Sequence, residues 1–403
     1  MQVKDYAGSA SGKFLEAANS VLLVGLIAWT FFVLRRAFSF PGLPFKGDYG
    51  LNLQQSLHVL HFHSFPHDFV YPLPYILLTY FLFKAAGFYS VILWMCAIAS
   101  AFYFNVRFLL AEFYTGDKRF TYLFFLLSFL PVAYYIQLDM TTLNCNLIDL
   151  SLVLLSMQRM KKGDWLSSGF FLALGVALKL YPIVLLPYLL LRKKFRVVLS
   201  TLAWTTVFFV LFPVLALGGS CFIELTGKWF QVLASTGAPG YLVSLPAHKI
   251  SLHYAILLLL SHGHPAQLLP PALYRAKATI FWLRMLIAGL GLLYLVFDLR
   301  KPLRNGEFHH ILFISVLILS ASLLFSELLQ PHHLVILLGC SIILMDSALN
   351  GDLPRRDRWI LAALIFLPFL ALKIAPSEAA KALAMNAQIV LYILCLMFLR
   401  LSS

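Results

Sequence analysis

Long apolar runs recur along the whole chain, and they limit what it can fold into more than any other feature. Of its 403 residues, 61% are hydrophobic and only 12% are charged, and the mean hydropathy is +0.85. A soluble protein of this length needs far more polar surface, whereas a membrane helix takes roughly 20 apolar residues. We therefore predict an all-α polytopic membrane protein with about ten to twelve transmembrane helices and no sizeable soluble domain.

The expected spans form one transmembrane domain over residues 1–403. The first run lacks a small-residue cleavage site and ends at Arg35 and Arg36, so we interpret it as an uncleaved helix. The five cysteines are widely spaced and lie mostly in apolar runs, which argues against a disulfide framework or a thiolate metal site. The expected spans are 17–35, 88–106, 120–137, 145–158, 197–217, 277–298, 309–326, 332–347, 358–374 and 387–401.

Basic residues cluster in short loops, and the net charge is +14. This pattern is typical of cytoplasmic loops that contact anionic lipid headgroups, and not of nucleic-acid binding. The loops are 107–119, 159–162, 192–196, 300–304 and 355–358. If all of them are cytoplasmic, residues 165–192 must form a hairpin of two half-helices with its apex at 179–182, where Pro182 breaks the helix.

The same assignment places both chain ends in the cytoplasm and makes 71–84 and 250–262 juxtamembrane or re-entrant helices on the outer side. The outer face then holds 36–87, 138–144, 218–276 and 327–332, where aromatic and histidine residues gather. We therefore expect any reaction centre on the extracytoplasmic side.

Two aspartates stand out in the first outer segment, because Asp and Glu number only 17 against 31 Lys and Arg. A carboxylate among apolar groups at a bilayer surface gains basicity, which suits Asp48 as a general base. Equally, Asp48 could cap a helix that starts near Leu51. Asp68 follows His67 and precedes Pro72 by four residues, so it is either a helix cap or a substrate contact.

The histidines of this segment resemble a metal site only superficially. Of His58, His61, His63 and His67, one pair alone has helical i, i+3 spacing, and no cysteine is near. A solvated interfacial face, or hydrogen bonding to a sugar or phosphate, is favoured over zinc.

Several basic residues fall on the predicted outer side, against the positive-inside bias. Arg35, Arg36 and Lys46 would suit a phosphate at the interface, or they snorkel from a helix end. Lys179, at the hairpin apex, either pairs with a buried acid such as Asp149 or faces an active cavity.

A late outer loop, SELLQPHHL, carries Glu327, His332 and His333. A helix that starts at a proline and opens with two histidines directs hydrogen-bond donors above the membrane. A polar turn with interfacial histidines would show the same sequence pattern. The motifs GxxxxGK[ST], GxGxxG, GxSxG, HExxH and Asp-x-Asp are all missing from the sequence. Without a cytoplasmic nucleotide-binding domain, an activated sugar would have to arrive on a lipid.

Taken in order, these segments resemble the GT-C polytopic glycosyltransferases, and most closely glycosyltransferase family 87. The matching elements are Asp48-Tyr49, FVYPLP at 69–74, TTLNCN at 141–146, GVALKLYP at 175–182 with the basic run RKKFR, HKISL at 248–252, and SELLQPHH at 326–333. The segments 141–146 and 248–252 depart most from the family pattern.

The resemblance implies transfer of a hexose, mannose in first place, from a polyprenyl-phosphate donor to a lipid-linked or envelope glycan acceptor. It implies inversion with Asp48 as general base, no cofactor or metal, and no nucleic-acid partner, in a prokaryotic plasma membrane. A flippase or transporter of lipid-linked sugars and an O-antigen-type ligase or polymerase are the alternatives. Expected substrate contacts are Tyr49, His67, Asp68, Tyr71, Asn144, Asn146, Lys179, Glu327, His332 and His333, and expected donor-phosphate contacts are Arg35, Arg36, Lys46, His248 and Lys249.

Overall fold

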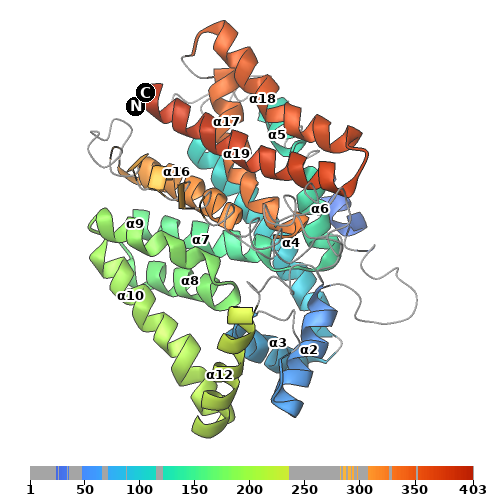
Figure 1. The fold of residues 1–403 in the computed structure, drawn as a ribbon, viewed down its shortest axis with the longest axis vertical. Coiled ribbons are helices and arrows are strands. Elements are labelled where there is room, and N and C mark those ends of the chain that lie inside the picture. The colour runs from blue at the N-terminus through green and yellow to red at the C-terminus, as the bar shows by residue number, and fades with distance from the viewer. Residues whose placement is uncertain are drawn as a thin grey trace, which may run out of the picture.

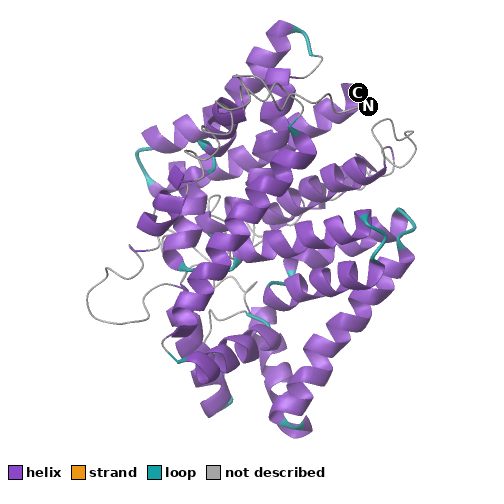
Figure 2. Ribbon diagram, turned by 180° about the vertical axis from the view of Figure 1, so that it is seen from behind, coloured by secondary structure: helices purple, strands orange, loops and turns teal. Residues whose placement is uncertain are grey.

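The computed structural model describes residues 48–65, 71–87, 89–114, 121–235, 307–325, 329–350 and 353–402, together with 24–25, 27–33 and 35 and nine helical positions between 282 and 297. These residues form helices joined by short turns, and no strand occurs among them (Figures 1 and 2). The prediction of an all-α polytopic membrane protein is therefore confirmed.

Four helices in the described part are long and apolar enough to cross a membrane. They are α4 (Tyr89–Phe113), the segment Phe195–Leu217, the segment Pro331–Asn350 and the apolar part of α19 (Glu378–Ser402). The bent pair of α6 (Ala133–Thr142) and α7 (Asn146–Lys161) would make a fifth. The larger number expected from hydropathy stays a prediction.

Two of these spans are composite. Phe195–Leu217 consists of α10 (Phe195–Thr206), a π-helical turn η3 (Val207–Leu211) and α11 (Phe212–Leu217). Pro213 lacks an N–H and would clash with the carbonyl four residues earlier, so the wider turn before it keeps the helix continuous. Pro331–Asn350 consists of the 3₁₀ turn η6 (Pro331–Ile336) and α17 (Leu337–Asn350).

The predicted span 120–137 is wrong in one respect, because the helix is broken in the middle. α5 (Thr121–Phe129) ends just before Pro131, and α6 begins at Ala133. The expected outer loop 138–144 is also wrong, since α6 continues to Thr142. Hydroxyls of Thr141 and Thr142 donate to the carbonyl of Leu138, so these polar residues satisfy themselves within the helix.

α7 lies at the centre, packed against α4 and α8 (Trp165–Leu178), and α8 packs in turn on α10 (Figure 1). α17, α18 (Arg355–Ile374) and α19 pack together on the other side of the core, with α16 (Glu307–Ser322) and its 3₁₀ extension η5 (Leu323–Phe325) beside them. The chain between α8 and α10 contains the 3₁₀ turn η2 (Tyr181–Val184) and α9 (Leu185–Leu191).

A smaller group of helices lies at one end of the structure, where α2 (Asp48–Phe62), α3 (Leu73–Ala86) and α12 (Gly219–Ser235) meet (Figure 1). Val59, Leu73, Ile76, Leu77 and Leu225 form an apolar cluster between them, separate from the main core.

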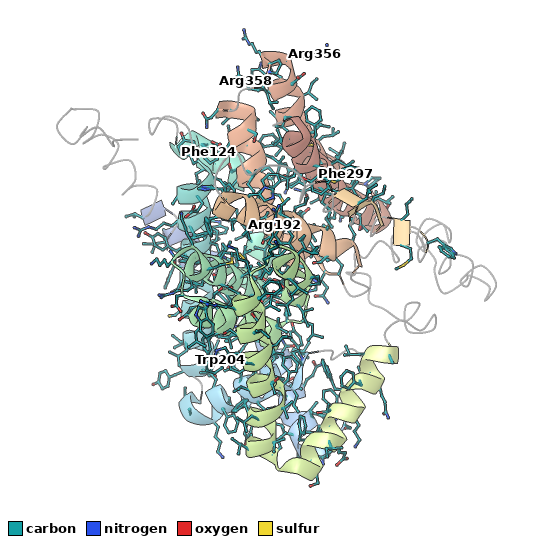
Figure 3. All side chains as sticks on the ribbon, turned by 90° about the vertical axis from the view of Figure 1, so that its left-hand side faces the viewer. Phe124, Arg192, Trp204, Phe297, Arg356 and Arg358 are labelled. Atoms are coloured by element: carbon teal, nitrogen blue, oxygen red, sulfur yellow. The ribbon has the colours of Figure 1, made fainter. Side chains whose placement is uncertain are left out.

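Three of the five basic segments, 107–119, 159–162 and 192–196, lie together around the start of α16, because their side chains contact one another or that helix. Lys161 binds Glu112 with a 2.7 Å ion pair, and His309 lies 3.4 Å from the same carboxylate. Arg192 contacts His310 and lies over the ring of Tyr188. We call the region around Glu112, Lys161, Arg192, His309 and His310 the basic end of the molecule. Arg356 and Arg358 lie apart from Arg192, near the start of α18 (Figure 3).

Candidate active site

The turn between α6 and α7 places two asparagines in the core. The helices meet at 110°, and Leu143 allows this by adopting a left-handed conformation with φ of 56°. The buried carboxylate of Asp139 then accepts from Asn146 Nδ2 at 2.6 Å and from the Leu147 N–H at 3.1 Å. Asp139 thus satisfies a free N–H at the start of α7, where the helix dipole favours a negative charge.

Lys179 reaches this turn from the end of α8. The helix stops at Leu178, and Lys179 is extended, with φ of −146° and ψ of 135°. Its ammonium donates to Asn144 Oδ1 at 2.9 Å and to Asn146 Oδ1 at 2.6 Å. The charge is therefore held by two neutral amides, and no described carboxylate lies within ion-pair distance of it.

His332 completes the network from the start of η6. Its Nε2 lies 3.0 Å from Asn144 Nδ2, and its carbonyl accepts from Asn146 Nδ2 at 3.3 Å. The orientation of the Asn144 amide is fixed, because Oδ1 already accepts from Lys179 and from the Cys145 N–H at 2.8 Å. Nδ2 is therefore the atom of Asn144 that faces His332 Nε2 and the donor of this hydrogen bond.

Aromatic residues form one wall of this network. Nζ of Lys179 lies 5.7 Å from the centre of the Tyr71 ring, and the Tyr71 hydroxyl lies 3.5 Å from Asn144 Nδ2. Tyr71 stacks on Tyr75 with ring centres 4.4 Å apart, and Tyr75 accepts a 3.0 Å hydrogen bond from Asn52 of α2. Tyr71 and Lys179 are only partly buried, whereas Asn144, Asn146 and His332 are buried.

The start of α2 is tied to the same turn. Tyr49 is fully buried and stacks on Trp94 with ring centres 5.2 Å apart. The indole of Trp94 donates to the carbonyl of Leu143 at 3.0 Å, next to Asn144. Asp48 is the first residue of α2 and directly precedes Tyr49, so its backbone lies beside this aromatic anchor.

Six of the predicted substrate contacts thus fall in or beside one network: Tyr49, Tyr71, Asn144, Asn146, Lys179 and His332. His333 is adjacent, with its ring 4.7 Å from that of His332, and its Nδ1 accepts from the Gln330 N–H. Arg35 is exposed on its helix. His67, Asp68, Glu327, Arg36, Lys46, His248 and Lys249 lie outside the described residues.

Of the two alternatives for Lys179, the pairing with Asp149 is wrong, because the structure shows no ion pair between these two side chains. The carboxylate of Asp149 is fully buried near the Tyr181 hydroxyl, but no hydrogen bond of ordinary geometry joins the two. Gly175 makes room for it, since a Cβ there would lie 3.0 Å from Asp149 Oδ1.

The sequence did not single out Asp139, Asn52, Tyr75 or Trp94. Asp139 had a signal, because a carboxylate in an apolar stretch shortly before two asparagines is costly unless it is hydrogen-bonded. The other three lie on helix faces whose neighbours only the fold determines.

His63, directly after α2, contacts α12 and not this network. His63 lies 3.3 Å from Glu224 of α12, and Lys228 donates to the His63 carbonyl at 2.6 Å. Hydrogen bonds from Lys228 and His63 hold the pKa of the exposed Glu224 below its usual value. Within the described ranges, no group of three His, Cys, Asp or Glu side chains is arranged to hold a metal ion.

The comparison with known proteins agrees with this geometry. No curated protein matches the chain significantly. A model of glycosyltransferase family 87 matches residues 69–326, more than half of the chain, and this range includes Tyr71, Asn144, Asn146 and Lys179. The chain therefore belongs to glycosyltransferase family 87, and it is a membrane-embedded glycosyltransferase.

Proposed function

We propose that this glycosyltransferase moves a hexose, in first place mannose, from a polyprenyl-phosphate donor to a lipid-linked or envelope glycan acceptor. The observation that carries the proposal is the Lys179 ammonium, which is held by the amide oxygens of Asn144 and Asn146. A cation with only neutral partners in a low-dielectric site attracts an anion strongly. The phosphate of the donor supplies that negative charge.

The neighbouring groups suit a sugar phosphate. Tyr71 and Tyr75 offer a stacked aromatic surface beside Lys179, with Asn52 and Asn144 as polar groups at its edges. Sites of this kind orient a ligand by a few fixed polar groups on an otherwise apolar lining. The apolar helices around the site leave the isoprenoid tail in the membrane.

Asp48 takes the proton in this mechanism. It lies one helical turn before Asn52, so the two positions share a face of α2. The acceptor hydroxyl oxygen attacks the anomeric carbon while the bond from that carbon to the phosphate oxygen breaks. The proton goes to Asp48, and the polyprenyl phosphate leaves with the bonding electrons. Attack from the opposite face inverts the anomeric centre, and Lys179 stabilises the departing phosphate.

The distribution of charge supports an extracytoplasmic position for the site. Asn146 begins α7 and Lys161 ends it, so about 22 Å of helix separates the polar network from the basic end. The positive-inside rule favours a cytoplasmic basic end, and this supports a position of the network towards the outer leaflet.

The test is transfer by purified protein in liposomes that contain labelled polyprenyl-phosphate mannose and a lipid extract as acceptor source. We expect Asp48→Asn to lower the rate by about 10²–10⁴, the usual contribution of a positioned base. Asp357→Asn, at the start of α18, serves as the matched control and should transfer normally. Label that changes leaflet without joining a second molecule would indicate a transporter, and normal turnover by Asp48→Asn would exclude Asp48 as the base.

A further inference from the structure

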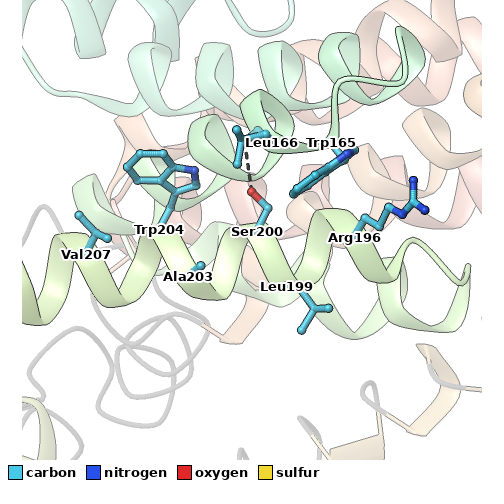
Figure 4. A pocket seen from close by; sticks show the side chains of 8 residues that line it. All are labelled: Trp165, Leu166, Arg196, Leu199, Ser200, Ala203, Trp204 and Val207. Atoms are coloured by element: carbon cyan, nitrogen blue, oxygen red, sulfur yellow. Dashed lines mark hydrogen bonds between the residues drawn. The ribbon is translucent and has the colours of Figure 1, made fainter.

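A groove of about 630 Å³ runs along the outside of α8 and α10, away from the active site (Figure 4). Arg196 lies at one end and Val207 at the other, and the indoles of Trp165 and Trp204 lie on either side of Ser200 in its middle. The remaining lining is Leu166, Leu199, Ser200 and Ala203.

The two helices that carry the groove approach each other closely at Gly169. A Cβ on Gly169 would lie 2.3 Å from Ser200 Oγ and 2.7 Å from the Thr201 nitrogen, so the backbones approach closely there. Large side chains on either side of that contact cannot enter it and leave a hollow between them. Ser200 is not available to a ligand, because its hydroxyl donates to the Leu166 carbonyl at 3.2 Å.

Neighbouring aromatic rings hold Trp204 in place. Trp204 packs edge-on against Phe170 with ring centres 5.1 Å apart, and it lies nearly parallel to Phe208 at 6.1 Å. Packing on both sides fixes the indole before any ligand arrives, which lowers the entropic cost of binding.

Length and charge together identify the occupant. Arg196 and Val207 are eleven residues apart on one helix, so the groove is about 16 Å long, roughly half of a 30 Å hydrocarbon core. Its charged end lies in the basic run, next to Lys193 and Lys194, and the nearby Asp164 is engaged in capping α8 through the Ser167 N–H. An apolar trough one leaflet deep with a cationic end fits a lipid with an anionic headgroup.

We propose that this groove binds one anionic diacyl phospholipid of the leaflet at the basic end, with an acyl chain between Trp165 and Trp204 and the phosphate at Arg196. The site is separate from the sugar-transfer site, and its occupancy does not depend on the identity of the donor.

The experiment is native mass spectrometry of the full-length protein released from nanodiscs of equal phosphatidylglycerol and phosphatidylcholine. The unaltered protein is expected to retain one phosphatidylglycerol in preference to phosphatidylcholine. Arg196→Gln should reduce that preference about five-fold, the contribution of one interfacial arginine, while Arg355→Gln should leave it unchanged. Ala203→Trp should fill the groove and abolish retention, while Leu202→Trp, on the same helix outside the groove, should not.

Equal retention of both lipids by the unaltered protein would overturn the proposal, as would normal retention by Ala203→Trp. A third arm adds polyprenyl phosphate at the mole fraction of phosphatidylglycerol. Its displacement of the phospholipid would show that the groove belongs to the isoprenoid and would also overturn the proposal.

Discussion

At the residue scale, the charge of Lys179 is the feature on which substrate binding depends. Lys179→Met removes the ammonium and leaves a side chain of similar length, so the attraction for the donor phosphate is lost. We expect kcat/KM for the donor to fall by about 10²–10³, as when one preorganised donor is removed. The loss of two hydrogen bonds to Asn144 and Asn146 should also lower the free energy of unfolding by about 1–3 kcal/mol. Steady-state kinetics and denaturant titration in detergent measure the two effects separately.

Lys84→Met, at the exposed end of α3, is the control for removing a lysine from this protein. Lys179→Arg keeps the charge but replaces a compact ammonium by a planar fork, so it should recover only part of the activity. Equal kcat/KM for Lys179→Met and the unaltered protein would show that the phosphate binds elsewhere.

The partner of Lys179 could not be read from the sequence. Asn146 and Asp149 are three residues apart on α7 and share the face towards α8, so either of them could have met the lysine. The choice is made by the extended conformation of Lys179 after the end of α8, which aims the side chain at Asn144 and Asn146. Sequence spacing identifies a face, but not the direction of a side chain beyond a helix end.

At the element scale, the close contact of α8 and α10 at Gly169 positions Lys179. Gly169→Ala places a Cβ against Ser200 and the Thr201 backbone, and the backbone atom cannot rotate away. We expect a loss of about 1–3 kcal/mol in the free energy of unfolding, the usual cost of overpacking, and weaker transfer, because α8 moves. Thermal unfolding in detergent checks the first effect.

Gly227→Ala on α12 is the matched control, because no atom lies within 4 Å of its added Cβ. That substitution should be neutral or slightly stabilising through helix propensity. Adding Ser200→Gly to Gly169→Ala removes the side-chain clash and should restore part of the stability. A Gly169→Ala protein as stable as the unaltered one would show that the helices are not in tight contact there.

The elements themselves were partly predictable. Apolar runs and proline positions predicted the spans at 88–106, 197–217 and 332–347, where α4, α10 with α11, and α17 lie. Pro131 also indicated a helix break, but the apolar residues on both sides of it made residues 120–137 look like one continuous span. The helix through Thr141 and Thr142 could not be foreseen, because threonines in a short polar stretch favour turns unless their hydroxyls bond within a helix.

At the scale of the whole molecule, the two ends of the central helices differ in chemistry. The ends of α4, α7 and α9 and the start of α16 meet at the basic end, where Glu112, Lys161 and Arg192 contact neighbouring helices. The opposite ends of α7 and α8 meet at the amide network around Lys179. The charge of the loops predicted that the basic segments share one side of the membrane. It could not predict which residues at the opposite ends of the helices would contact one another.

This difference between the two ends predicts from which side of the membrane a reagent can label each turn. α17 starts beside His332 and α18 runs back along it, so Ser377, between α18 and α19, belongs to the side of the sugar-transfer site. Lys193 lies in the turn at the basic end, and both residues are exposed. In a protein whose five native cysteines are replaced by alanine, Ser377→Cys should react with a membrane-impermeant maleimide in intact cells. Lys193→Cys should react only after the cells are permeabilised. Labelling of both cysteines from one side would place the basic end and the catalytic network on the same face, and the extracytoplasmic reaction would have to be abandoned.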